Sequence, residues 1–159
     1  MGNYKDIEVE FVERTLKLIS QYESILNKFE FSEQYNYTLL LNCMLGLIVV
    51  TKETNLSHIP TDRLTKGLKK DMGLIYSTIS ENIHTLRDLI ICLRHSISHF
   101  NIAVIPDLDD EKNIINHFDF FNDKDGKKYL ICRFYASELL PFLRYYGSWY
   151  ISNKEKFSK

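Results

Sequence analysis

Three side chains within one short stretch have the chemistry of a catalytic site. Arg94, His95 and His99 lie in the segment RHSISHF, residues 94–100. An imidazole titrates near neutral pH, so a histidine can take up or release a proton during a reaction. A guanidinium stays charged and can grip two phosphate oxygens at once. We assign His99 as the principal acid or base, Arg94 as the phosphate clamp and His95 as a supporting polar group.

The surrounding residues 83–101 predict one long helix with two different faces. At roughly 100° per residue, its apolar side chains gather into one stripe, which is typical of a helix packed on a core. The members of this stripe are Ile83, Leu86, Leu89, Ile90, Leu93, Ile97 and Phe100. The other face carries Arg94 at its edge and then Ser98, His84, His95, Asp88, His99 and Ile91. A polar face that also holds Ile91 and Cys92 indicates an interface.

The helical spacing of Arg94 and His99 favours a symmetric pair of chains. On an ideal helix the two residues are roughly 140° apart, so their side chains need not touch. Either Arg94 bends back toward His99, or a partner chain supplies the facing group. A two-fold symmetric dimer places the same helix face opposite itself, and it would bury Ile91 at the interface.

The segment RHSISHF resembles the R-x4-6-H signature of the HEPN family (higher eukaryote and prokaryote nucleotide-binding domain). The matching positions are Arg94, the polar His95 that follows it, and His99. The motif lies in the C-terminal half of an apolar helix, late in a small and mainly helical chain, and the resemblance covers most of the chain. A β-hairpin in the C-terminal third resembles an insertion seen in some subgroups.

This resemblance implies a metal-independent endoribonuclease, such as a toxin or defence protein, that acts on RNA as a homodimer. Two copies of the motif would meet across the dimer interface, so that neither chain holds a complete site. RNA supplies its own nucleophile, the 2′-hydroxyl, so the protein has to move protons and stabilise the charged phosphorane. An antitoxin or a nucleotidyltransferase is the implied partner. The alternative is a non-catalytic HEPN-like helical module that binds nucleotide, RNA or a partner protein.

Each site residue also has a purely structural interpretation. Arg94 can pair with Asp88 or Glu81, or cap helix carbonyls, and His99 can serve as a C-terminal cap. His95 and His99 have the i, i+4 spacing that suits zinc. A zincin needs Glu at position 96, where this chain has Ser96, and only Asp88 or His84 would offer a third ligand. We therefore expect no metal and no cofactor.

The periodicities predict a mainly α protein, a bundle of about four to five helices with a β-hairpin before the last helix. We expect a single HEPN-like domain over residues 1–159. The first helix is predicted over residues 5–29 and the second over 32–51, with Ser32 as its cap, followed by a short helix after Thr61. The hairpin, roughly residues 113–135, turns at Asp-Gly. The last helix starts at Ser137, with Pro141 in its first turn.

Composition and charge limit the binding partners and the cellular location that we expect. The chain has 159 residues and a net charge of −1, so no overall positive field draws it to nucleic acid, and any RNA-binding surface has to be local. Its three cysteines lie in apolar runs, which favours buried thiols in a reducing cytosol. The N-terminus lacks the apolar run of a secretory signal. The longest apolar run, residues 37–50, is shorter than the roughly 20 residues of a membrane helix. We therefore expect a cytoplasmic protein without membrane contact.

Overall fold

The protein combines helices with one antiparallel sheet. The computed structural model describes residues 3–49, 56–108, 114–153 and 155. Within them the helices are α1 (Ile7–Ile25), α2 (Asn36–Met44), α4 (Lys66–Asp71), α5 (Leu86–Ser98) and α6 (Ala136–Ser152). The strands are β1 (Thr78–Ile79), β2 (Ile102–Pro106), β3 (Ile115–Lys124) and β4 (Lys127–Tyr135). The four strands form a sheet in the order β1-β4-β3-β2, in which every neighbouring pair is antiparallel.

The protein is mainly helical, as predicted, but its β structure is larger than the predicted hairpin. The architecture is mixed α/β, because the predicted hairpin does not stand alone. It supplies the two central strands of the sheet, and β1 and β2 pair with its outer edges. The stretch NIAVIPDLDDEKN, residues 101–113, predicts a loop or a short strand, and β2 lies within it. No strand was predicted at β1, which has two residues and therefore too few positions for a period-two pattern.

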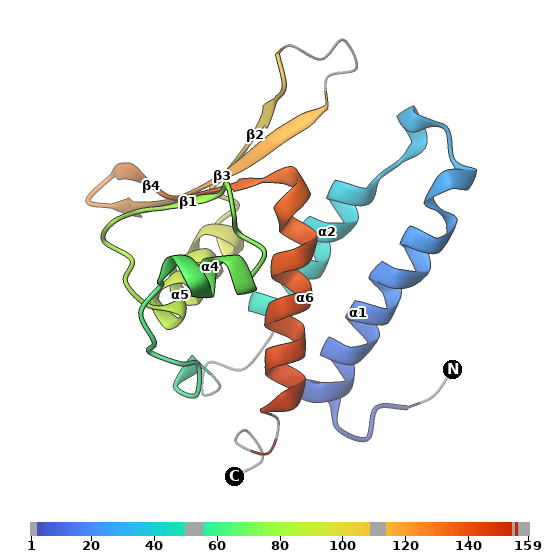
Figure 1. Ribbon diagram of the computed structural model, residues 1–159, viewed down its shortest axis with the longest axis horizontal. Helices are drawn as coiled ribbons and strands as arrows, with labels where there is room; N and C mark the ends of the chain where they lie inside the picture. The colour runs from blue at the N-terminus through green and yellow to red at the C-terminus, as the bar shows by residue number, and fades with distance from the viewer. Residues whose placement is uncertain (1–2, 50–55, 109–113, 154, 156–159) are drawn as a thin grey trace.

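The core lies between one face of the sheet and the helices. Phe118 pairs with Phe134 across the two central strands, and both side chains are fully buried. The ring of Phe134 also lies 5.1 Å from that of Phe142 on α6, in an edge-on arrangement that aromatic pairs prefer. Figure 1 shows the sheet at the top of the view, with α6 running down from it and α1 and α2 beside α6. Helix α5 packs under the same sheet, against β3 and β4.

The hairpin turn confirms the Asp-Gly prediction. Asp125 has a φ of 55° and Gly126 a φ of 73°, the pair of positive values that a two-residue type I′ turn requires. The side chain of Asp123 secures the turn, because its Oδ1 accepts a hydrogen bond from the Gly126 amide at 3.0 Å. The strands β3 and β4 therefore meet in a tight end at residues 124–127.

The starts of the second, the short and the last helix differ from the prediction. The second helix, α2, begins at Asn36, because Phe31–Glu33 forms a separate 3-10 turn. Ser32 lies inside that turn and therefore does not cap the helix. The predicted end of the second helix at residue 51 lies outside the described residues. The short helix α4 is capped by Thr65, not Thr61, and Thr65 Oγ1 accepts from the Leu68 amide at 3.2 Å. The last helix starts at Ala136, one residue earlier than predicted.

Pro141 therefore lies in the second turn of α6, not the first, where its ring removes one helical hydrogen bond. Gly73 packs directly against this proline. A Cβ at Gly73 would lie 2.3 Å from the Pro141 Cβ, and the φ of Gly73 is 75°. Only glycine fits this close approach, which holds the end of α4 against α6.

A buried carboxylate joins the loop after α4 to helix α6. Glu138 Oε1 accepts hydrogen bonds from the amides of Ile75 at 2.8 Å and Tyr76 at 2.9 Å. Its Oε2 accepts from the Ser77 amide at 2.9 Å and the Ser77 hydroxyl at 2.6 Å. Burial works to raise the pKa of Glu138, but these hydrogen bonds outweigh it, so the pKa lies below its ordinary value.

In the part of the chain that the structure describes, every helix is too short or too polar to cross a bilayer.

Candidate functional site

The helix that carries the candidate residues starts with a reciprocal cap. Thr85 Oγ1 accepts from the Asp88 amide at 3.1 Å, and Asp88 Oδ2 accepts from the Thr85 amide at 3.1 Å. This cap requires Thr85 in an extended conformation, so α5 begins at Leu86, three residues after the predicted start. The carboxylate of Asp88 therefore serves the helix N-terminus, which weakens its interpretation as a partner of Arg94 or as a metal ligand.

The predicted core stripe of α5 is confirmed except at its end. The buried members are Ile83, Leu86, Leu89, Ile90, Leu93 and Ile97. Phe100 was wrongly assigned to the stripe, since 80% of it is exposed. The helix stops at Ser98, His99 takes the C-cap position, and Phe100 has a φ of 52°. The left-handed residue turns the chain away from the helix axis, so Phe100 leaves the stripe.

The two histidines of the motif lie next to each other at the exposed end of α5. The ring centroids of His95 and His99 are 4.5 Å apart, with the ring planes tilted by 54°. Both residues are exposed, whereas Arg94 is half-buried. The His99 amide donates to the His95 carbonyl at 3.2 Å, so His99 occupies the capping position that the structural interpretation expected, and its ring still contacts His95.

An open hollow of about 470 Å³ lies beside these rings. His95, His99, Asn101 and Asp123 line it, and among the described residues Arg94 does not. The structure therefore brings the two imidazoles together at the hollow.

Asn101 and Asp123 were missed in the sequence. The Phe121 amide donates to the Asn101 carbonyl at 2.9 Å, which ties β3 to the residues that follow α5 and brings Asp123 near the histidines. The Asp-Gly turn signalled the hairpin, but the pattern carries no signal for a contact between residues so distant along the chain. Asn101 has a local signal, since it follows His99 by two positions at the predicted end of the helix.

Ile91 lies on the same exposed surface of α5 as His95, one turn earlier. The side chain is 44% exposed, in agreement with its predicted place on the polar face. An exposed apolar residue of this kind is common on protein surfaces, so exposure alone does not identify an interface. It does show that Ile91 is accessible to a second molecule.

The remaining histidines lie away from this cluster. His84 is exposed just before α5, His58 is exposed in a loop, and His117 lies in β3, as predicted. No group of three or more His, Cys, Asp or Glu side chains suited to a metal ion occurs among the described residues. The third ligand that zinc would need beside His95 and His99 is thus not found within that part of the chain.

The three thiols are poor nucleophiles. Cys43 and Cys132 are buried as predicted, and Cys92 is half-buried. Burial raises the pKa of each thiol, and the Asp88 carboxylate raises that of Cys92 further. A raised pKa keeps a thiol protonated at neutral pH, and the thiolate is the reactive form. Nucleophilic catalysis by cysteine is therefore not favoured here.

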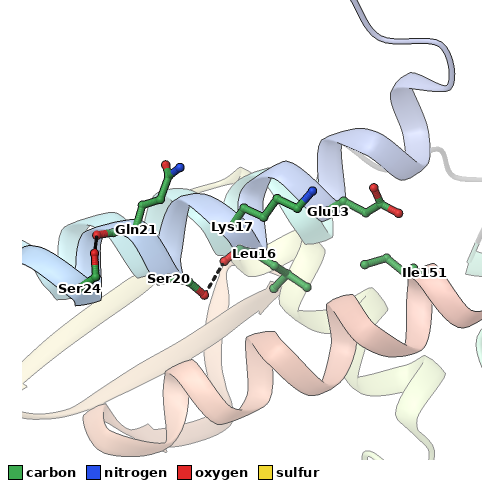
Figure 2. Close-up of a pocket in the computed structure, with 7 residues that line it drawn as sticks. All are labelled: Glu13, Leu16, Lys17, Ser20, Gln21, Ser24 and Ile151. Atoms are coloured by element: carbon green, nitrogen blue, oxygen red, sulfur yellow. Dashed lines mark hydrogen bonds between the residues drawn. The ribbon is translucent and has the colours of Figure 1, made fainter. Parts of the chain in front are cut away.

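A larger hollow, of about 580 Å³, lies between α1 and α6 and lacks comparable chemistry. It is lined by Glu13, Leu16, Lys17, Ser20, Gln21, Ser24 and Ile151. Figure 2 shows Leu16 and Ile151 between the two helices, with the polar side chains on α1. The hydroxyl of Ser20 donates to the Leu16 carbonyl and that of Ser24 to the Gln21 carbonyl, so each hydroxyl proton is directed at the helix backbone and not at a basic side chain. The smaller hollow at the histidines is the better candidate site.

Comparison with known proteins adds one match. The family model described as HEPN pEK499 p136 matches residues 1–157, which is nearly the whole chain. No curated protein and no solved structure matches the chain. The family match confirms the resemblance that the motif suggested, while the role of each site residue still has to be argued from its chemistry.

Proposed function

Because the chain belongs to the HEPN pEK499 p136 family, we propose that it is an endoribonuclease of the HEPN type, which cuts single-stranded RNA without a metal ion. The observation that supports this most is the pair of exposed imidazoles, 4.5 Å apart, at an open hollow. Two adjacent imidazoles allow one to take a proton while the other gives one, which is what internal attack by a ribose hydroxyl requires.

The proposed reaction uses the RNA 2′-hydroxyl as nucleophile. A base removes its proton, the oxygen attacks the neighbouring phosphorus, and an acid protonates the departing 5′-oxygen. His99 is the principal acid or base, and His95 is the polar group beside it. Each such proton transfer contributes about 10²–10⁴-fold to the rate. Arg94 stabilises the negative charge that gathers on the phosphorane oxygens.

The proposed site is shared between two copies of the chain. Arg94 is not among the described residues that line the hollow at His99, which supports a clamp supplied by the second copy. A two-fold pairing of α5 helices would bring Arg94 of one copy to the histidines of the other. Ile91, exposed on the same surface, would then be buried between the copies.

In this proposal residues 1–159 act as one domain in the cytoplasm, as a toxin or defence protein. An antitoxin or a nucleotidyltransferase would be the partner that restrains it. The exposed position of both histidines supports restraint by a partner protein, since a bound surface would close the hollow directly.

The test is cleavage of single-stranded RNA by purified protein in EDTA. We expect Arg94→Ala and His99→Ala to lose at least about 100-fold in rate. His84→Ala and Arg144→Ala are matched controls, because His84 is exposed outside the site and Arg144 pairs with Glu23 on α1. Circular dichroism would check that all four variants are folded. Equal activity in all four variants would rule out the site.

The non-catalytic alternative makes a different prediction for the same proteins. A HEPN-like binding module would leave RNA intact under every condition, yet it would bind RNA, nucleotide or a partner protein through Arg94 and His99. If the chain is a monomer, the absence of Arg94 from the described lining of the hollow favours this alternative. Binding without cleavage, lost in the same two variants, would support it.

A further inference from the structure

Helix α5 ends in a turn that normally requires glycine. The Phe100 amide donates to the Ile97 carbonyl at 3.1 Å, and the Asn101 amide donates to the Ser96 carbonyl at 2.8 Å. These two bonds, together with a φ of 52° at Phe100, define a Schellman motif with Phe100 at its left-handed position. Glycine is the usual residue there, because a Cβ in the left-handed region collides with the following carbonyl.

Neither the backbone nor the core explains a phenylalanine at this position. The left-handed conformation is strained for any residue with a Cβ, and backbone strain of this kind is found mostly at functional sites. The side chain gains little packing in return, since Phe100 is 80% exposed. The apolar contact that often accompanies this motif comes from the next residue, not from the left-handed one. The chain therefore keeps a strained and exposed aromatic ring where glycine would be more stable.

The surroundings of Phe100 point to a ligand with flat rings and negative charge. Phe100 lies between His99 and Asn101, and both of these line the hollow at the histidines. Asp123 also lines the hollow and leads into the hairpin end, where Lys124, Lys127 and Lys128 are exposed beside Asp125. Exposed aromatic rings and lysines are the groups that bind single-stranded nucleic acid, through base stacking and phosphate contacts.

We propose that Phe100 stacks on a base of single-stranded RNA, next to the phosphodiester held at His95 and His99. This inference rests on the proposed ribonuclease function and adds a substrate-binding residue to it. Stacking accepts any base, because every base has a π face, so Phe100 favours unpaired RNA without selecting a sequence. Paired RNA hides its bases, which predicts weak binding of duplexes.

Three variants at position 100 distinguish the effect of base stacking from the effects of side-chain size and of backbone strain. Phe100→Gly removes ring and strain together, so we expect Tm to rise by about 2–4 °C while RNA affinity falls. Phe100→Leu keeps an apolar side chain and the strain but has no π face, so it should lose affinity without gaining stability. Phe100→Trp keeps a π face and should bind as the wild type does.

Affinity is measured by fluorescence anisotropy with a labelled single-stranded RNA carrying 2′-O-methyl groups, which the proposed reaction cannot cleave. We expect Phe100→Gly and Phe100→Leu to bind about 5- to 150-fold more weakly than wild type. Wild-type affinity in both variants would overturn the stacking proposal. So would loss of the dimer in Phe100→Gly by analytical ultracentrifugation, which would place the ring in a contact with a second copy.

The outcomes also separate this proposal from the proposed function. If wild-type protein cuts unmodified RNA and Phe100→Gly cuts it equally well, the ribonuclease stands and the stacking role fails. If wild-type protein neither binds nor cuts RNA, both fail together. If it binds RNA through Phe100 without cutting it, stacking holds and the catalytic assignment of the histidines fails.

Discussion

The hydroxyl of Ser96 donates a hydrogen bond of 2.9 Å to the backbone carbonyl of Asn101. Ser96 is completely buried inside the R-x4-H motif, and Asn101 lines the hollow beside the two imidazoles. The same carbonyl accepts from the Phe121 amide, so one oxygen ties the end of α5 to strand β3. The serine between the motif residues thus positions the chain that borders the candidate site.

Ser96→Ala is expected to lower the free energy of unfolding by about 1 kcal/mol, because it removes one buried hydrogen bond. Ser98→Ala is the matched control on the same helix, since the Ser98 hydroxyl is exposed and donates to the His95 carbonyl. The control should change stability by less than about 0.5 kcal/mol. Urea denaturation measures both, and an equal loss would show that the Ser96 contact contributes nothing specific.

Ile91→Asp is expected to weaken the proposed dimer at least about tenfold, since it would bury a carboxylate between the two copies. The fold should persist, because Ile91 is 44% exposed in the single chain. Leu18→Asp, at a similarly exposed apolar position on α1, is the control. Sedimentation velocity gives the assembly state. A wild-type monomer, or an Ile91→Asp dimer of undiminished affinity, contradicts the shared site.

Glu138→Gln is expected to destabilise the protein by about 1–3 kcal/mol at neutral pH. Glutamine has one acceptor oxygen, so part of the amide cluster of Ile75, Tyr76 and Ser77 loses its partner. The pKa of Glu138 is lowered from 4.5 in the folded state, so the unfolded chain binds this proton first as the pH falls. The contribution of the Glu138 carboxylate to the free energy of unfolding is therefore present above pH 4.5 and is lost as the pH falls below it.

Urea denaturation of wild type and Glu138→Gln, from about pH 3 to about pH 7, would measure how the free energy of unfolding depends on pH. The stability difference between the two proteins should narrow in acid. If the stability difference stays constant or widens below pH 4.5, the hydrogen bonds to the carboxylate do not lower the pKa of Glu138.

Two glycines form a matched pair for backbone strain. Gly73 and Gly126 have nearly the same φ, 75° and 73°, but a Cβ would strike Pro141 at 2.3 Å in the first case and meet nothing within 4 Å in the second. Gly126→Ala should cost about 1–2 kcal/mol from strain alone. Gly73→Ala should cost about 1–3 kcal/mol more, from the collision. Equal losses in thermal unfolding would show that the contact at Pro141 relaxes freely.

Periodicity and turn chemistry predicted the parts of this protein that are determined locally. The buried stripe of α5 from Leu86 to Ile97 follows from helical spacing, and the hairpin turn follows from Asp125-Gly126. The two histidines of the motif lie at the exposed end of α5 and Arg94 is half-buried, while the roles assigned to them stay a prediction. Local patterns did not reveal β1, whose two residues become a strand only by pairing with β4.

Phe100 shows why the end of the helix was missed. An apolar residue in step with the stripe predicts burial, and no glycine marked the turn that removes it from the helix. Asp123 was missed for a different reason. Its place at the hollow depends on the hydrogen bond between Phe121 and Asn101, which joins two segments far apart in the chain. Such contacts are set by the assembled fold.

The most direct test of the central claim is the RNA cleavage rate of a mixed dimer, made by co-expressing Arg94→Ala and His99→Ala chains with different tags. If Arg94 of one copy acts with His99 of the other, the mixed dimer holds one complete site out of two and should cut at about half the wild-type rate. Each parent dimer should be inactive. A mixed dimer as inactive as its parents would contradict a site shared between two chains.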